Sequence, residues 1–348
     1  HMILNFMSKI NDMYDYKVIL IVHGKINQNL LKICEDRNLK LLKWPSPSPI
    51  YLRDALFFLR TIFKYKPICI IASMKPTNIM ILVSFLCNIK NRIIWIRSGL
   101  PKVDKNNLRT FLKKIIFQMS NGILAVSKNI SFMYDYKYSI KDKKKIILHN
   151  LIGDPLKGEP YSLGQREKII LSVGRLVQEK GHSTLLNAYS IIIKKYGHDV
   201  KLVIVGDGPY RSQLENQAKH LMITNNCKLL GSLPYEELTE YYKKALVTII
   251  PSECHESFGY AIIESMAFGT PVIASNIGGI PEVINHGQNG LLFANGNPDE
   301  LAKSIDKVLS DYDLWYKINK NSRDSFLKKF NIESSMDHYA QLFTDWIN

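Results

Sequence analysis

Two acidic residues in the second half of the sequence stand where they could bind a polar ligand. The segment "PSECHESFGYAIIESMAFGTPVIAS" (251–275) carries Glu256 and Glu264, eight residues apart. Ser257 is predicted to cap a helix that runs to Gly269, with Glu256 just before it and Glu264 two turns inside. Free N–H groups at a helix start favour phosphate, whereas carboxylates accept hydrogen bonds from hydroxyls. This order fits an extended ligand with hydroxyls at both ends and a diphosphate between, as in a nucleotide sugar.

Two basic residues follow a predicted strand nearer the middle of the chain. In "SVGRLVQEKG" (172–181) the strand ends at Gly174, and Arg175 and Lys180 come next. A guanidinium fork and an ammonium point charge both suit diphosphate oxygens. "GDGP" (206–209) also ends a strand, but it is not G-x-G-x-x-G, so a dinucleotide fingerprint is absent. A plainer alternative stays open, in which the acids lie in a loop and on a solvated helix face.

The elements that must position these residues alternate between strand and helix patterns. Continuous β-branched runs occur at 168–174, 200–208, 226–232, 245–252 and 271–275, and less clearly at 16–24, 67–73, 91–99, 122–128 and 144–150. Helical spacing separates the runs, which is typical of parallel sheets covered on both faces. The Gly- and Pro-rich stretch 153–164 lies between the two sets. The sequence therefore predicts two doubly wound α/β domains, with ligands at the carboxyl ends of the strands and in the cleft between them.

Charge is distributed unequally between the two halves. Residues 1–150 hold 26 Lys and Arg against 8 Asp and Glu, a net charge of +18, whereas residues 151–348 carry a net charge of −3. This asymmetry indicates an anionic partner for the first half. The five cysteines form no C-x-x-C pair, so a reducing cytosol is expected. The longest apolar run, 79–89, is far shorter than the roughly 20 residues that cross a bilayer.

The motif order carries a family resemblance over residues 165–310. G-R-x-x-x-x-K-G, G-D-G-P, L-G-x-L, "ESFGYAIIESMAFGTPVIAS" and "GGIPEVI" together resemble the group-one (family four) retaining glycosyltransferases. The resemblance implies two Rossmann-like domains facing a cleft, the GT-B arrangement. It implies an acceptor-binding domain at 1–152, a linker at 153–164 and a nucleotide-sugar domain at 165–330. The final helix, 331–348, is expected to dock back onto the first domain.

The resemblance also implies residue roles. Glu256 would hold the hydroxyls of the donor sugar, Glu264 would hold the ribose hydroxyls, and Arg175 and Lys180 would clamp the diphosphate. Glu256, Arg175 and Lys180 are therefore the expected catalytic residues. The backbone at Gly174, Ser257, Phe258 and Gly259 would add to the donor site, and Gly231, Ser232 and Leu233 would meet the nucleotide base. The implied activity is a hexosyl transfer with retention of anomeric configuration.

The first half departs from the family pattern. In "IIWIRSGLP" (93–101), Ser98 stands where the family usually places a histidine near the reacting sugar. The chain opens with a predicted helix leading into a strand rather than with a strand and a Gly-rich loop, so this end is short or the loop is replaced. A catalytically inactive glycosyltransferase-like binding module is therefore the alternative. Nucleic acid is disfavoured as a partner because no aromatic-plus-basic signature accompanies the charge.

Neither a cofactor nor a metal is expected, since no D-x-D pair or His/Asp cluster accompanies the proposed phosphate site. The expected partners are a nucleoside-diphosphate sugar and a lipid-linked acceptor saccharide in bacterial surface polysaccharide or glycan biosynthesis. The segments 53–66 and 102–119 combine apolar and basic residues at helical spacing. In the second, Lys105, Arg109, Lys113 and Lys114 lie beside Phe111, Leu112, Ile115, Ile116 and Met119. These faces predict a cytoplasmic protein in peripheral contact with an anionic inner membrane surface, although ordinary core packing remains an alternative.

Overall fold

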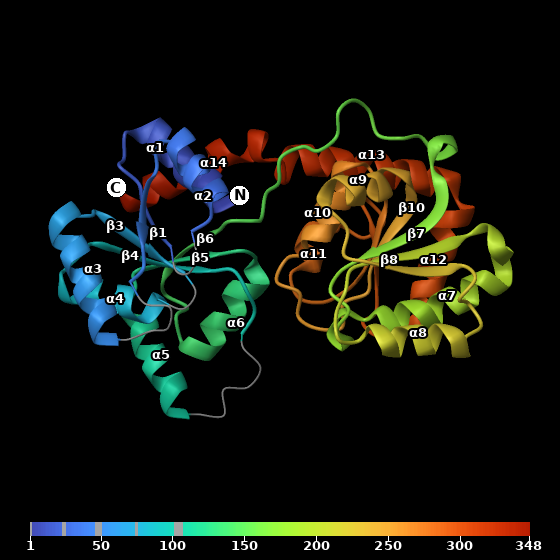
Figure 1. The fold of residues 1–348 in the computed structure, drawn as a ribbon, viewed down its shortest axis with the longest axis horizontal. Coiled ribbons are helices and arrows are strands. Elements are labelled where there is room, and N and C mark those ends of the chain that lie inside the picture. The colour runs from blue at the N-terminus through green and yellow to red at the C-terminus, as the bar shows by residue number, and fades with distance from the viewer. Residues whose placement is uncertain (1, 23–25, 46–50, 74–75, 101–106) are drawn as a thin grey trace. The chain divides into compact units, whose positions relative to one another are not determined.

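The computed structural model describes residues 2–22, 26–45, 51–73, 76–100 and 107–348. They divide into two compact units (Figure 1). Unit 1 lies within residues 1–150 and includes 335–348, and unit 2 comprises residues 151–334. The division thus falls after residue 150, and the stretch predicted as a linker, 153–164, groups with unit 2.

Unit 2 is built on one six-stranded sheet. Its strands are β7 (Glu167–Val173), β8 (Lys201–Val205), β9 (Cys227–Gly231), β10 (Ala245–Ile250), β11 (Val272–Ser275) and β12 (Leu291–Phe293). They pair in the order β12-β11-β10-β7-β8-β9, and every pair is parallel. Five of these strands were predicted, whereas β12 was not, because three residues carry too little pattern to be recognised.

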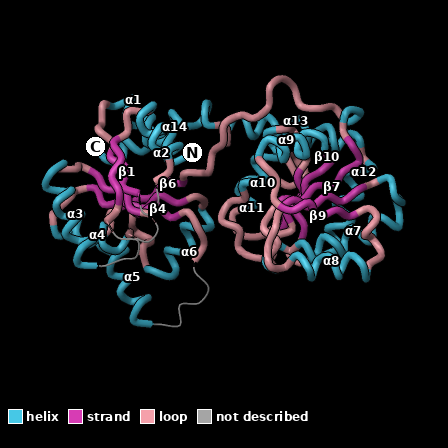
Figure 2. The backbone as a smooth tube through the Cα atoms, viewed as in Figure 1, coloured by secondary structure: helices cyan, strands magenta, loops and turns pink. Residues whose placement is uncertain are grey.

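Helices cover both faces of this sheet, as Figures 1 and 2 show. The helices α7 (His182–Tyr196), α8 (Arg211–His220) and α12 (Pro298–Ser310) pack together on one side. The helices α9 (Tyr235–Lys244), α10 (Tyr260–Ala267) and α13 (Tyr312–Lys329) pack on the other. Short helical segments lie at α11 (Ile280–Val283), Leu163–Gln165, Gln178–Lys180 and Gly197–Asp199. All six residues of β10 are buried, as a central strand with helices on both faces requires.

Unit 1 has two parallel sheets. β1 (Ile19–Val22) pairs with β2 (Lys40–Lys43), and β3 (Cys69–Ala72), β4 (Asn91–Ile96), β5 (Gly122–Ala125) and β6 (Lys144–Ile147) pair in that order. The five predicted strands are present, and β2 was missed because Lys40 and Lys43 flank only two apolar residues. The predicted α/β class with parallel sheets is confirmed in both units.

The helices of unit 1 also lie on two sides of its strands (Figure 1). They are α1 (Met2–Tyr14), α2 (Gln28–Asp36), α3 (Tyr51–Tyr65), α4 (Thr77–Leu86), α5 (Asn107–Met119), α6 (Lys128–Tyr138) and α14 (Ile332–Ile347). The Phe6 ring of α1 packs edge-on against Trp95 of β4 at 5.7 Å and against Phe343 of α14 at 5.5 Å. The last helix thus buries the Phe343 ring in the core of unit 1. In the described parts of the chain, none of the helices has the length and apolar character needed to cross a bilayer.

Candidate functional site

The strand order of unit 2 creates a switch point between β7 and β10. The chain runs outward from β7 through β8 to β9 and then returns to β10, on the opposite side of β7. Loops after two such strands diverge, and ligands of open parallel sheets bind in the crevice at their carboxyl ends. The loop after β7 contains Arg175 and Lys180, and the loop after β10 contains Glu256. Gly174 and residues 257–259 also lie in these loops, so seven of the eight predicted donor-site residues belong to them.

The loop after β7 comes very close to its neighbours. Gly174 donates its N–H to the Val205 carbonyl at 3.0 Å, which ties the end of β7 to β8. Gly181 has φ +69°, and a Cβ at this position would collide with the carbonyl of Pro251, just after β10. Only glycine meets both conditions without strain. Gly181 therefore lets the loop that carries Lys180 lie against the loop that carries Glu256.

Lys180 and Glu256 form an ion pair. The Lys180 Nζ lies 2.5 Å from a carboxylate oxygen of Glu256, and the two side chains are 23% and 18% exposed. Ser252 donates its hydroxyl to the same oxygen at 3.1 Å. The Glu256 carbonyl accepts the Gly279 N–H at 2.8 Å, so the turn at Gly278 and Gly279 after β11 supports this position. Three loops at the carboxyl edge therefore converge on Glu256. Arg175, in the loop after β7, is exposed.

The helix that follows Glu256 begins later than predicted. Ser257 is not its cap, since α10 starts at Tyr260 and Gly259, with φ +93°, precedes it. Phe258 explains the difference, because its side chain is 1% exposed and packs edge-on against Phe330 at 5.8 Å. Burying this ring draws residues 257–259 into a turn. The helix has eight residues rather than about three turns, and Gly269 follows it as predicted.

Glu264 lies half-buried on α10 and is held from one side. The Tyr242 hydroxyl, from the end of α9, donates to one Glu264 carboxylate oxygen at 2.9 Å. Burial raises the pKa of Glu264, and the hydrogen bond from Tyr242 partly opposes that rise. Burial and the nearby Glu264 charge raise the pKa of Tyr242 well above its usual value. Tyr242 therefore remains a donor, which leaves the second carboxylate oxygen of Glu264 to accept from a ligand hydroxyl.

The predicted base region lies at the end of β9. The Gly231 carbonyl accepts the Gly206 N–H at 2.8 Å, which joins the base region to the "GDGP" loop. A Cβ on Gly206 would collide with the Gly174 carbonyl, so the "GDGP" loop also adjoins the start of the Arg175 loop. Ser232 is exposed and Leu233 is half-buried just beyond. The base region is thus linked through the backbone to the loop that carries Arg175.

Three further residues adjoin the site and were missed. Tyr242 gave no sequence signal, because only the fold brings it to Glu264. Arg211 donates to the Leu229 carbonyl at 2.9 Å next to Gly231. Its position at the first residue of α8 is a usable signal, since cations are unfavourable at helix amino ends. His182, the first residue of α7, lies beside Gly174 and is buried.

His182 is held neutral by its surroundings. Burial, and secondarily the charge of Lys180, lower its pKa to about 4. Its Nδ1 is buried and makes no hydrogen bond with any described group.

Within the described ranges, no three His, Cys, Asp or Glu side chains gather as a metal site would require. The expectation that no metal takes part stays a prediction.

Ser98 belongs to unit 1. It follows β4 by two residues, at the carboxyl end of that strand, and is exposed.

The side chains expected on a membrane-facing helix at 102–119 are only partly described. Lys105 lies outside the described residues, and nothing is described of the Arg109 side chain. Phe111, Leu112 and Ile115 are 58%, 53% and 37% exposed on α5.

Sequence comparison finds a family model that matches most of unit 2. Residues 158–325 match the model of the glycosyl transferases group 1. The chain is 39% identical over 165 residues to an uncharacterized glycosyltransferase of Methanocaldococcus jannaschii, covering 47% of this chain and 42% of that protein. It is 28% identical to the lipopolysaccharide core biosynthesis glycosyltransferase LpsE of Rhizobium meliloti, covering 50% and 49%. The chain spans about half the length of the curated relatives it matches.

Structural comparison extends over the whole chain. Anabaena HepE, solved in complex with UDP, superimposes with a TM-score of 0.77 at 18% identity, covering 98% of this chain and 96% of that one. This likeness shows that both units share the GT-B fold. Residues 158–325 thus match the group 1 glycosyl transferases, and the whole chain shares their fold.

Proposed function

We propose that this protein transfers a sugar from a nucleoside-diphosphate sugar to an acceptor hydroxyl. One observation carries the proposal: Lys180 and Glu256 meet at the switch point of unit 2, and Glu264 lies on α10, the helix that follows Glu256. A cation for phosphate and carboxylates for hydroxyls are the groups that such a donor needs. The UDP complex of HepE, which has the same fold, supports a nucleotide ligand for this site.

The roles of the residues follow from the charge that develops during transfer. As the sugar departs, negative charge grows on the diphosphate. Arg175, Lys180 and the backbone N–H groups around Ser257, Phe258 and Gly259 would stabilise that charge. Glu256 would orient the sugar through its hydroxyls and would not act as a nucleophile. Glu264, steadied by Tyr242, would hold the ribose. Retention of anomeric configuration is the stereochemical outcome that we propose.

We further propose that the reaction requires no metal, because Arg175 and Lys180 supply the positive charge. Chelation with EDTA should leave the rate of transfer unchanged. A loss of activity that Mg²⁺ or Mn²⁺ restores would contradict this part of the proposal.

For the acceptor, we propose a lipid-linked saccharide used in surface polysaccharide or glycan assembly. The similarity to a lipopolysaccharide core glycosyltransferase supports this choice. Such an acceptor would lie at a membrane, and we propose that unit 1 makes peripheral contact with the anionic inner face of that membrane. α5 exposes Leu108, Phe111, Leu112 and Ile115, and residues 1–150 carry the +18 charge. Binding to anionic but not to neutral liposomes, lost at high salt, is the expected result.

The second candidate is a donor-binding module without catalysis. Ser98 favours it, because this exposed residue after β4 stands where the family resemblance implies a histidine. Donor hydrolysis separates the two candidates. A competent enzyme slowly releases sugar to water, whereas a pure binder leaves the donor intact.

A panel of nucleotide sugars tests the proposal directly. A donor that binds only the folded protein must raise its melting temperature, so thermal stabilisation identifies the base and the sugar. Transfer is then followed with that donor and candidate acceptors. If no nucleotide sugar stabilised the protein, the assignment of the site in unit 2 would be wrong.

A further inference from the structure

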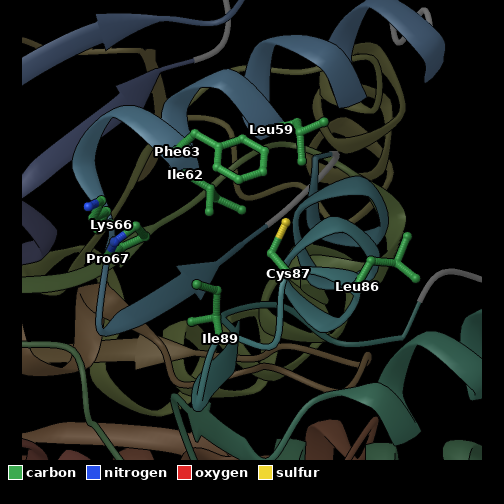
Figure 3. Close-up of a pocket in the computed structure, with 8 residues that line it drawn as sticks. All are labelled: Leu59, Ile62, Phe63, Lys66, Pro67, Leu86, Cys87 and Ile89. Carbon is green, nitrogen blue, oxygen red and sulfur yellow. The ribbon is translucent and has the colours of Figure 1, made fainter.

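An apolar crevice lies between α3 and α4 in unit 1 (Figure 3). Its volume is about 520 Å³, within the roughly 300–1,000 Å³ of pockets that bind small molecules. Side chains of α3 form one side, and the end of α4 with the following turn forms the other. The apolar lining comes mainly from Leu59, Ile62, Phe63, Leu86, Cys87 and Ile89. The crevice therefore offers an apolar surface that a hydrocarbon group could contact.

The crevice opens onto an unusually apolar exterior. Phe63 is 69% exposed, and Leu52 and Leu56 precede it on the same helix with 74% and 46% exposure. On α4, Phe85 and Leu86 are 46% and 73% exposed. α3 packs beside α4, and α4 packs beside α5, which carries its own exposed apolar side chains. Exposed apolar side chains gathered on adjacent helices mark an interaction surface.

The exposed charges in the segment that carries α3 and α4 have one sign. Asp54 is the only acidic residue between positions 51 and 92, and its side chain is fully buried. The exposed charged residues nearest the crevice in sequence are all cationic: Arg60, Lys64, Lys66 and Lys90. Lys66 also lines the crevice itself. A partner must therefore offer apolar groups and negative charge together.

An anionic membrane lipid meets this requirement better than a protein partner does. A second copy of the chain docked through the same face would bring like charges together, which is costly. A bilayer with anionic head groups presents hydrocarbon beneath a layer of negative charge. We propose that the crevice takes one hydrocarbon chain of an anionic membrane lipid, with the lipid phosphate at Lys66.

The position of the crevice makes this lipid an anchor and not the acceptor. α3 ends at Tyr65 before β3 begins, and α4 ends at Leu86 before β4 begins, so the crevice lies at the amino ends of these strands. Ligands that react on such sheets bind at the opposite, carboxyl edge. This inference rests on the proposed membrane contact of unit 1, and it is independent of donor binding by unit 2.

Cys87 provides a reporter inside the crevice. Its half-buried thiol can be alkylated by a water-soluble maleimide, and mass spectrometry can follow each cysteine separately. Vesicles containing phosphatidylglycerol should slow the alkylation of Cys87 at least about tenfold. A monomeric short-chain phosphatidylglycerol should do the same, whereas inorganic phosphate or vesicles of neutral phosphatidylcholine should not. Cys254, half-buried in unit 2, is the internal control and should keep its rate.

Variants at the rim distinguish binding in the crevice from non-specific adsorption to vesicles. Phe63→Glu and Leu86→Glu should abolish protection of Cys87 and weaken sedimentation with anionic vesicles. Met222→Glu, at an 89% exposed residue of unit 2, is the matched control and should change neither result. Lys66→Ser should weaken vesicle binding roughly fivefold, and Lys168→Ser in unit 2 should not.

Three outcomes would overturn the inference. In the first, the protein sediments with anionic vesicles while Cys87 reacts at its free rate, so the crevice stays empty. In the second, Cys87 is protected only as protein concentration rises, without lipid, so a second copy is the occupant. In the third, no lipid binds at all. Thermal stabilisation by nucleotide sugars is measured in parallel on the wild type and on Phe63→Glu. This measurement tests the proposed donor site independently of the lipid crevice.

Discussion

Lys180 and Glu256, 76 positions apart in the sequence, are joined at 2.5 Å between ammonium and carboxylate. The pair satisfies two charges that are largely removed from solvent, and it does so at the switch point where a donor would bind. A diphosphate entering the site would compete with Glu256 for Lys180. Glu256 would then accept hydrogen bonds from the sugar hydroxyls in place of the one from Lys180.

This exchange predicts opposite effects of the two alanine variants on a nucleoside diphosphate that lacks the sugar. Lys180→Ala should weaken its binding roughly ten- to hundredfold, because a charge-assisted hydrogen bond is lost. Glu256→Ala should leave binding equal or tighter, since Lys180 is released, but should abolish transfer. Calorimetry measures both affinities. Lys168→Ala, which removes an exposed pair with Asp199, is the control. Equal losses from Glu256→Ala and Lys180→Ala would disprove the assigned order.

The Tyr242–Glu264 hydrogen bond predicts a pH dependence of nucleotide binding. Burial raises the pKa of Glu264, and ribose hydroxyls need its ionised form, so affinity should fall as pH drops through this raised pKa. Tyr242→Phe removes the hydrogen bond that lowers that pKa. The acidic fall in affinity should therefore move to higher pH, while affinity well above it changes little.

Nucleotide affinity is measured by calorimetric titration between about pH 4.5 and about pH 8, because raised carboxyl pKa values lie in that range. Tyr241→Phe, on the neighbouring residue of α9, provides the control. A uniform loss of affinity at every pH in Tyr242→Phe would assign the tyrosine a purely structural part.

His182 predicts a pH dependence of stability. Its pKa is about 4 in the folded protein and 6.5 ordinarily, so between these values the unfolded chain binds a proton that the folded chain does not. Stability that is fully present above pH 6.5 is thus lost progressively as pH falls toward 4. The full effect is about 3 kcal/mol.

His182→Gln should remove this part of the slope, as urea unfolding at pH 7 and at about pH 4.5 would show. His220→Gln, at an exposed histidine of the same unit, should keep the wild-type slope. If His182→Gln and the wild type lost the same stability on acidification, His182 would be charged in the folded protein.

Replacing Gly181 with alanine should lower the stability of the folded protein by more than the cost of its positive φ. Alanine at a positive φ costs about 1–2 kcal/mol, and at Gly181 its Cβ would also press on the Pro251 carbonyl. Gly287 has a similar φ of +72° with open space around it, so Gly287→Ala isolates the conformational part. Gly181→Ala should be the more destabilising variant in denaturant and should also weaken nucleotide binding, because Lys180 shifts with it. Matching losses from both variants would contradict the close approach.

The sequence alone determined most of the elements and the identity of the candidate residues. Strand patterns and helical spacing are local, so ten strands, the parallel α/β class and the positions of Arg175, Lys180, Glu256 and Glu264 could be predicted from short windows. The start of α10 could not, because the choice between helix and turn at Ser257 depends on burying Phe258 against Phe330, which lies far along the chain.

Tertiary structure decided how the residues of the site act on one another. The ion pair of Lys180 with Glu256 and the donation from Tyr242 to Glu264 join separate elements, and no periodicity encodes such contacts. The same holds in unit 1, where Gly122 leaves room for the Trp346 ring of the last helix. Local propensity selects each element, but long-range packing sets which side chains lose water together, and that desolvation determines the ion pairs and shifted pKa values of the site.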